Sequence, residues 1–130
     1  VSPGVYNVWK CESTKSVISV PSKVNGREVR YIGDSAFLGC ESLVSVTLPE
    51  TLLKIGVSAF EGCTSLANVA LPESIMSINA QAFKGCIALN KIHLPDSLRS
   101  IGEQAFADCP ALAPVDIPAL VTHIGQDAFG

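Results

Sequence analysis

Hydrophobic and polar residues alternate along short segments of this chain, and a proline closes each segment. In the segment Leu43–Pro49, apolar residues alternate with Ser45 and Thr47. Such alternation is typical of a β-strand with one buried face. The proline ends the strand because it has no N–H group to donate to the next strand. The pattern recurs in Leu66–Pro72, Leu89–Pro95 and Leu112–Pro118, so we predict four equivalent strands.

The segments recur because the chain repeats with a step of 23 residues. In each repeat an isoleucine precedes Gly or Asn, and an Ala-Phe pair follows at a fixed offset. Such a step is the signature of a solenoid, and we predict about four coils with the phenylalanines stacked in the core. A second short strand is expected at segments such as Leu52–Ile55. The repeated residues are Ile32, Ile55, Ile78, Ile101 and Ile124; Phe37, Phe60, Phe83, Phe106 and Phe129; and Cys40, Cys63, Cys86 and Cys109.

Two turns are predicted in each repeat from the positions of Gly and Asn. One follows each isoleucine and the other precedes each cysteine. Gly and Asn tolerate a positive φ, so we expect a left-handed backbone at both turns. The piece between them, such as Ser35–Leu38, has the length of one helical turn, and the fold is therefore expected to be α/β with little helix. The expected left-handed residues are Gly33, Gly56, Asn79, Gly102 and Gly125 after isoleucine, and Gly39, Gly62, Gly85 and Asp108 before cysteine.

The N-terminal part departs from the repeat. Val17–Pro21 matches the strand pattern, but five extra residues follow it and contain Asn25-Gly26, a strong signal for a tight β-hairpin. Upstream, Val5–Cys11 is predicted to form a hairpin with Ser16–Val20. This hairpin is expected to cover the open end of the first coil, because an uncovered terminal coil exposes its core and strand edge.

The string Leu-x-x-Val-x-Leu-Pro, followed by Ile-Asn-x-x-Ala-Phe-x-Gly-Cys in Leu66–Cys86, resembles the BspA-type leucine-rich repeat. The resemblance covers about residues 17–130. It implies a right-handed leucine-rich-repeat solenoid with a parallel sheet on its concave side. It also implies a surface or secreted protein, since several members of the family act in adhesion and bind host proteins. We expect one domain overall, with residues 1–31 as N-terminal β-hairpin cap and first-coil strand and residues 32–130 as the 23-residue coils.

Composition and charge narrow the function classes. The chain has 130 residues, of which 48% are hydrophobic and 16% charged, so a packed core is expected rather than disorder. No apolar run approaches the ~18 residues of a membrane span, so no membrane insertion is expected. The net charge of −3 argues against nucleic acid as a partner. Residues 1–31 carry five basic and two acidic side chains and residues 32–130 carry four and ten, which gives +3 and −6.

The cysteines are interpreted as small buried hydrophobes. Side chains stacked in a column point in parallel, which is a poor approach for a disulfide. They also do not converge on one point, as the ligands of a metal ion must. Cys11 lies outside the repeat register and is either free or paired outside the chain.

The histidines do not indicate an enzyme. His93 and Asp116 fall in one column of neighbouring coils, where a His–carboxylate pair on the surface is expected. Thr47 in the same column lies two coils from His93, too far to serve as a nucleophile, and His123 has no obvious partner. We therefore predict no catalytic residues, no metal and no cofactor.

The outward positions of the predicted concave sheet are the best candidates for a binding surface. They are mostly small and polar and include no aromatic anchor. One hypothesis is a protein-binding or adhesion module with a protein or glycan ligand, because concave solenoid faces commonly bind partners. The alternatives are a plain structural spacer and a repeat protein that self-associates end to end. The candidate binding residues are Ser45, Thr47, Asn68, Lys91, His93 and Asp116.

Overall fold

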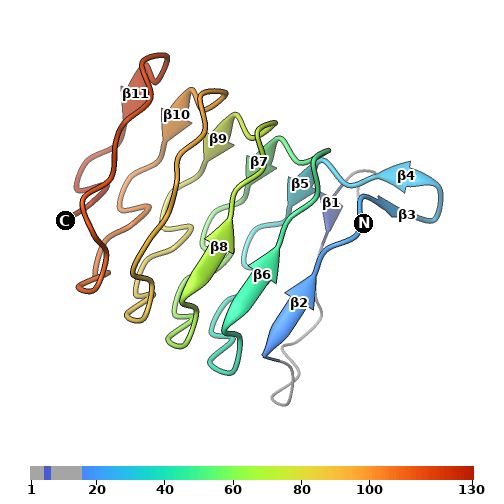
Figure 1. Cartoon of the computed structure of the whole chain (residues 1–130), viewed down its shortest axis with the longest axis horizontal. Coiled ribbons are helices and arrows are strands. Elements are labelled where there is room, and N and C mark those ends of the chain that lie inside the picture. The colour runs from blue at the N-terminus through green and yellow to red at the C-terminus, as the bar shows by residue number, and fades with distance from the viewer. Residues whose placement is uncertain (1–4, 7–15) are drawn as a thin grey trace.

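The computed structural model describes residues 5–6 and 16–130. These residues wind into a parallel β-solenoid of about four turns, with successive coils side by side along its length (Figure 1). A coil has two strand positions on opposite sides, so that a long parallel sheet runs along one side of the coil stack and a shorter parallel sheet covers the N-terminal part of the other side. The predicted repeat, with two strand positions in a coil, is confirmed.

The longer sheet has six strands, all paired in parallel. Each repeated isoleucine stands at the end of one of these strands and, in the inner coils, is buried. The strands in spatial order are β1 (Val5–Tyr6), β5 (Tyr31–Ile32), β7 (Lys54–Ile55), β9 (Ser77–Ile78), β10 (Ser100–Ile101) and β11 (His123–Ile124).

The shorter parallel sheet is incomplete relative to the prediction. It contains β2 (Val17–Ser19), β6 (Ser45–Thr47) and β8 (Asn68–Ala70), and a single bridge joins Asn68 to Lys91. Two of the four expected strands are not formed: Leu89–Pro95 contributes only the bridge at Lys91, and Leu112–Pro118 contains no strand residue. In Leu112–Pro118, Pro114 supplies the reason, because it stands where the earlier strands have a residue with an N–H group.

The predicted hairpin at Asn25-Gly26 is confirmed. Strands β3 (Lys23–Val24) and β4 (Arg27–Glu28) pair antiparallel, and Asn25 and Gly26 both have positive φ, 52° and 78°. The other predicted hairpin is wrong where the structure describes it. Strand β1 pairs in parallel with β5 and β2 pairs in parallel with β6, so both are rungs of the solenoid. Residues 7–11 of the expected cap strand lie outside the described residues, and the division into cap and coils stays a prediction.

The predicted helical turns are wrong: the described part of the chain contains no helix. Ser35, at the start of the first candidate turn, has a φ of 58°, outside the helical region. The N–H of Phe37 donates to the carbonyl of Ala59 in the next coil over 2.7 Å, instead of to a residue four positions earlier. Backbone hydrogen bonds between coils therefore replace those of a helix.

The predicted left-handed backbone is confirmed at the turn before each cysteine and is wrong at the residue after each isoleucine. Gly39, Gly62, Gly85 and Asp108, each before a cysteine, have positive φ. Gly56 does not, and it is required for a different reason: a Cβ there would lie 2.7 Å from the Ile32 carbonyl oxygen of the preceding coil. The left-handed residues lie instead two positions later, at Ser35, Ser58, Gln81, Gln104 and Asp127.

A column of phenylalanine rings runs through the core. Consecutive rings from Phe37 to Phe129 stack nearly parallel, with centroids 5.0–5.3 Å apart. The first four rings are buried, as predicted, whereas Phe129 is 41% exposed because no coil covers its outer side among the described residues. This column fixes the spacing of the coils that carry the candidate site.

Candidate functional site

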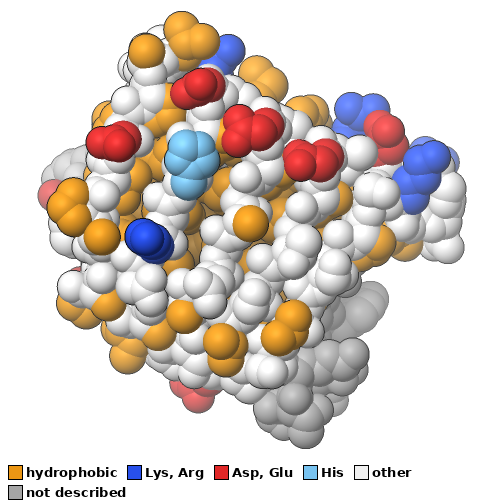
Figure 2. Space-filling model, in the orientation of Figure 1, with side chains coloured by type: hydrophobic (Ala, Val, Ile, Leu, Met, Phe, Trp, Pro, Cys, Tyr) orange, Lys and Arg blue, Asp and Glu red, His pale blue; other side chains and the backbone are white. Residues whose placement is uncertain are grey.

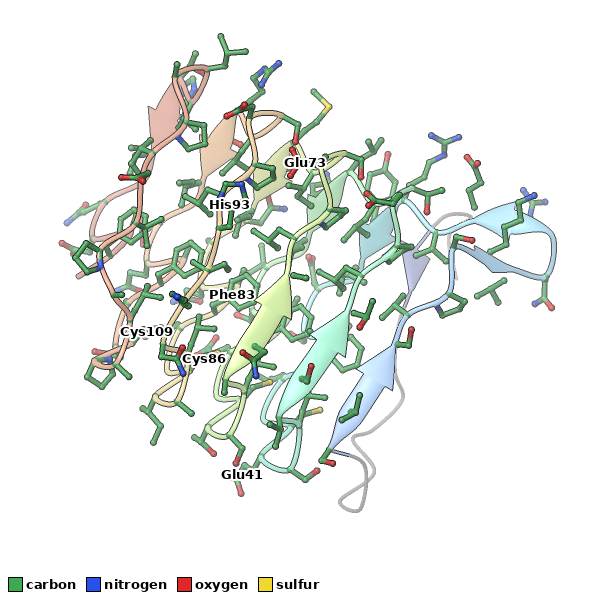
Figure 3. The ribbon with its side chains drawn as sticks, in the orientation of Figure 1. Glu41, Glu73, Phe83, Cys86, His93 and Cys109 are labelled. Carbon is green, nitrogen blue, oxygen red and sulfur yellow. The ribbon has the colours of Figure 1, made fainter. Side chains whose placement is uncertain are left out.

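The six predicted binding residues lie on the side of the molecule formed by β2, β6, β8 and the segments 91–96 and 113–118, here called the front face (Figure 3). The sheet register aligns Ser45, Asn68 and Lys91 in one row. Thr47 lies in a second row, opposite Ala70. Ser45 is half-buried, and Thr47, Asn68 and Lys91 are exposed.

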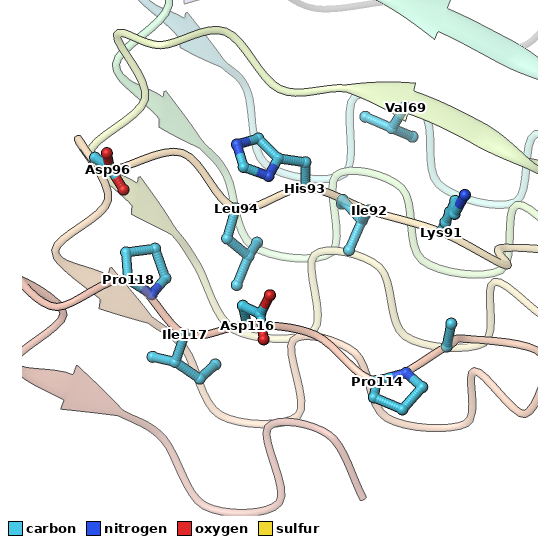
Figure 4. Close-up of a pocket in the computed structure, with 11 residues that line it drawn as sticks. Val69, Lys91, Ile92, His93, Leu94, Asp96, Pro114, Asp116, Ile117 and Pro118 are labelled. Atoms are coloured by element: carbon cyan, nitrogen blue, oxygen red, sulfur yellow. The ribbon is translucent and has the colours of Figure 1, made fainter.

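The remaining two predicted residues, His93 and Asp116, line a groove in the front face (Figure 4). The groove has a volume of about 530 Å³, within the range of ligand-binding clefts. It runs between segments 91–96 and 113–118 of two neighbouring coils. Its lining consists of Val69, Lys91, Ile92, His93, Leu94, Asp96, Ala113, Pro114, Asp116, Ile117 and Pro118.

The groove exists because the two coils separate on this side. In an earlier pair of coils the carbonyl of Val44 accepts from both Ala67 and Asn68, over 2.9 and 3.3 Å. In the following pair, which the structure also describes, no such bond joins Asn90 or Lys91 to the Ala67 carbonyl. At the groove the carbonyl of Asn90 accepts only from Ala113, over 2.9 Å, because the next residue is Pro114. No backbone hydrogen bond joins 92–95 to 115–118, both of which the structure describes.

The charged side chains of the groove have no protein partner. Within the described ranges the salt bridge found is that of Arg30 with Glu28, and no side-chain hydrogen bond involves Lys91, His93 or Asp116. The predicted His93–Asp116 pair is therefore not formed, because the coils that carry the two residues diverge. Both side chains are exposed and free to meet a ligand.

Acidic side chains gather on the same part of the front face (Figure 2). Asp96 lines the groove, although the sequence analysis did not single it out. A signal for it was present: the residue after the strand-ending proline is acidic in three successive repeats, as Glu50, Glu73 and Asp96. All three are exposed, so they form an acidic row beside the strands.

The cysteine column offers no reactive group. Cys63, Cys86 and Cys109 are free thiols, and each donates to the carbonyl of a phenylalanine in the preceding coil over 3.1–3.2 Å. Burial raises the pKa of Cys63 to about 11 and raises the pKa of Cys86 and Cys109 as well. The thiolate, which is the nucleophilic form, is therefore disfavoured.

Cys40 corrects the sequence interpretation. It is disulfide-bonded, not a free buried thiol. Its partner lies outside the described residues, as does the predicted state of Cys11. Cys63 and Cys86 match the prediction, because both are buried and neither is bridged, whereas Cys109 is unbridged but only half-buried.

The described residues contain neither a metal-binding cluster nor a membrane-spanning helix. No group of three or more His, Cys, Asp or Glu side chains is arranged to hold a metal ion there. No helix that could cross a membrane occurs in that part of the chain.

Fold and site together define a parallel β-solenoid with an open front face. Comparison with known proteins gives the family: a profile described as "BspA type Leucine rich repeat region" matches residues 9–130 in six copies. The chain belongs to this family of leucine-rich repeat proteins. The match begins before residue 17, where the sequence resemblance was expected to start.

Solved structures agree with this assignment. A leucine-rich repeat protein of T. pallidum is 40% identical with a TM-score of 0.86, covering 88% of this chain and 53% of its own. One from Bacteroides ovatus is 36% identical with a TM-score of 0.76, covering 87% and 30%. A leucine rich cell surface protein from Faecalibacterium prausnitzii is 27% identical with a TM-score of 0.50, covering 89% and 45%. The chain therefore spans about half of the length of the T. pallidum protein and less than half of the length of the other two. No curated protein matches it.

Proposed function

We propose that this chain is a non-enzymatic protein-binding or adhesion module of a surface or secreted protein, with its ligand on the front face. The observation that carries the proposal is the groove, in which exposed charged side chains have no partner within the described chain. Exposed charges that have no partner in the described chain are suited to complementary charges of an incoming partner. Membership in a leucine-rich repeat family supports an interaction role, because solenoids present extended binding surfaces.

The proposed location is the cell surface or the outside of the cell. It is supported by the relative from Faecalibacterium prausnitzii, whose title describes it as a cell surface protein. The disulfide at Cys40 also favours an oxidising compartment, where disulfides persist.

The proposal is tested with an array of purified host surface proteins and glycans, probed with the labelled 130-residue chain. The face variant Thr47→Arg/Asn68→Arg places two bulky cations on exposed front-face positions. The matched control, Leu38→Arg/Gln126→Arg, places the same side chains at exposed positions outside that face. We expect saturable binding that the face variant loses and the control keeps. Equal binding by both variants would remove the front face from the proposal, and no saturable ligand would remove the binding role.

Self-association end to end is the second candidate. Beyond Phe106 the last coil forms an apolar hollow of about 340 Å³, and its lining includes Leu112, Ile117, Ile124 and Phe129. Strand β11 is the outer edge of the six-stranded sheet and β1 is the opposite edge. Unpaired parallel edges can template pairing between copies, and a head-to-tail contact that does not close gives a filament.

Light scattering over a concentration series, at low and high salt, tests this second candidate. The sequence charges of +3 and −6 in the two parts predict that salt weakens the contact. Phe129→Asp should abolish the association, whereas Leu38→Asp, an exposed leucine away from the hollow, should not. A monomer at every concentration would discard this candidate while leaving the binding module intact.

A further inference from the structure

We propose that the groove between segments 91–96 and 113–118 binds an extended, Lys- or Arg-bearing peptide segment of a partner protein, which adds as a strand along residues 92–95. The inference rests on the proposed function and names the chemistry of the partner. It is carried by three independent features of the groove: a local separation of the coils, unpaired backbone groups and unpaired acidic side chains.

The separation is confined to the front face. On the opposite sheet the same two coils stay paired, with Ser100 opposite His123 and with the N–H of Gly125 donating to Ile101 over 2.8 Å. In the core, the rings of Phe106 and Phe129 keep the stacking distance of 5.3 Å. The two coils therefore form a wedge that is closed at the back and in the core and open at the front.

The open wedge leaves backbone groups without partners. Segment 92–95 follows Lys91, which an isolated bridge joins to Asn68 at the edge of the front sheet, and it belongs to no strand itself. Toward the next coil, no backbone hydrogen bond is made by 92–95 to 115–118, a part of the chain that the structure describes fully. Main-chain groups left unpaired beside a sheet can bind an extended peptide through hydrogen bonds, as the edge of a sheet does.

The charges of the groove select a cationic occupant. Asp96 and Asp116 line it, Glu73 belongs to the acidic row beside it, and neither Asp96 nor Asp116 makes an ion pair with a described residue. Lys91 lines the groove as well, so the lining carries one basic side chain beside the two acidic ones (Figure 4). Residues 32–130 carry a net charge of −6, which steers a basic segment toward this part of the molecule.

Apolar side chains supply the remaining contacts. Val69 and Leu94 are buried beneath the groove, and Ile117 is 41% exposed along it. Because side chains of a strand alternate in direction, an added strand places every second residue toward these apolar groups. The preferred peptide therefore alternates basic or polar residues with apolar ones.

The test uses three ten-residue peptides labelled for fluorescence polarisation. The first alternates Lys with Val, the second alternates Glu with Val, and the third is the Lys peptide with every second amide N-methylated. We expect the first to bind about tenfold or more tightly than either of the others, because the Glu peptide cannot make the charged hydrogen bonds and the N-methylated peptide loses main-chain hydrogen bonds. Equal affinity of the first two would overturn the charge selection. Equal affinity of the first and third would overturn strand addition, and no binding of the Lys peptide would overturn the site.

Variants locate the binding on the molecule. Asp96→Asn/Asp116→Asn removes two charges from the groove at exposed positions, and we expect it to weaken the Lys peptide about tenfold. The control Glu41→Gln/Glu103→Gln removes the same charge at exposed positions outside the groove and should change affinity less than twofold. Equal effects of both pairs would show unspecific attraction and overturn the site. If a partner found on the array is lost with Thr47→Arg/Asn68→Arg but bound normally by the Asp96/Asp116 variant, the proposed function stands and this inference fails.

Discussion

The thiol of Cys86 donates a hydrogen bond to the carbonyl oxygen of Phe60, 26 residues earlier and one coil away, over 3.2 Å. The same bond links Cys63 to Phe37 and Cys109 to Phe83. Each cysteine thus bonds to the same phenylalanine on which the ring of its own coil stacks: Cys86 bonds to the carbonyl of Phe60, and the ring of Phe83 stacks on that of Phe60. The cysteine and phenylalanine columns are therefore one structural device that holds neighbouring coils in register.

The buried thiols predict a loss of stability at alkaline pH. Burial raises the pKa of Cys63 from about 9.0 to about 11. A group whose pKa is higher in the folded state stabilises that state below the unfolded pKa, and this contribution disappears as the pH rises through the folded value. Between pH 9 and 11 the free energy of unfolding should therefore fall by roughly 2–3 kcal/mol through this thiol.

Urea unfolding at pH 8, 9, 10 and 11 measures this loss. Cys63→Ala serves as the comparison, because it lacks the titrating group while all lysines and tyrosines still titrate. A stability curve with the same slope in both proteins would contradict the prediction.

The phenylalanine column predicts position-dependent losses. Phe83 is fully buried between Phe60 and Phe106, so Phe83→Ala should lower the free energy of unfolding by roughly 3–5 kcal/mol. Phe129 is 41% exposed and stacks on one ring, so Phe129→Ala should cost less than half as much. Chemical denaturation compares the two, and equal losses would contradict the stacking argument.

The two glycine positions of a repeat should respond to different substitutions. A Cβ at Gly56 would meet backbone of the preceding coil at 2.7–2.8 Å, so Gly56→Ala should destabilise the fold by roughly 1–3 kcal/mol. Gly85 has a φ of 74° and no close neighbour, and Asp108 occupies the equivalent place in the next coil. Gly85→Asn should therefore change stability by less than about 1 kcal/mol. Thermal unfolding of the two variants checks this order, which the reverse ranking would refute.

Pro114 predicts a change in the groove itself. Pro114→Asn restores an N–H that can donate to the Asn90 carbonyl, as Asn68 donates to Val44 in an earlier coil. We expect a gain of about 0.5–1.5 kcal/mol in stability and slower amide exchange at Val115 and Asp116. The control is Pro110→Asn, a proline of the same coil that does not line the groove. Unchanged exchange at Val115 would mean that proline does not cause the separation of the coils.

Much of the fold could be predicted from the sequence because it depends on periodicity. The step of 23 residues places Phe83 above Phe60 and Ile78 beside Ile55, and the structure confirms both. The hairpin at Asn25-Gly26 was also predictable, since its turn needs positive φ at two adjacent residues. These features depend on residues close in sequence or exactly one repeat apart.

The predictions failed where the same residue type has two different roles within one repeat. Gly56 and Gly62 look alike in the sequence, but one avoids a clash with the preceding coil and the other adopts a left-handed backbone. The pieces between them were expected to be helical, because their length alone does not show that Phe37 donates to the next coil. Strand β1 was expected to fold back as a cap, although it adds a rung to the sheet.

The sequence by itself determined the coil, its core and the outward positions, among them Lys91, His93 and Asp116. Only the tertiary structure decided that His93 and Asp116 face a groove and do not pair. The physical reason is that the repeat sets which residues are neighbours, whereas the distance between neighbouring backbones depends on every hydrogen bond between two coils. At the groove Pro114 cannot donate to the Asn90 carbonyl, and the front of the two coils lacks further backbone bonds, while the back sheet and the phenylalanine column stay closed.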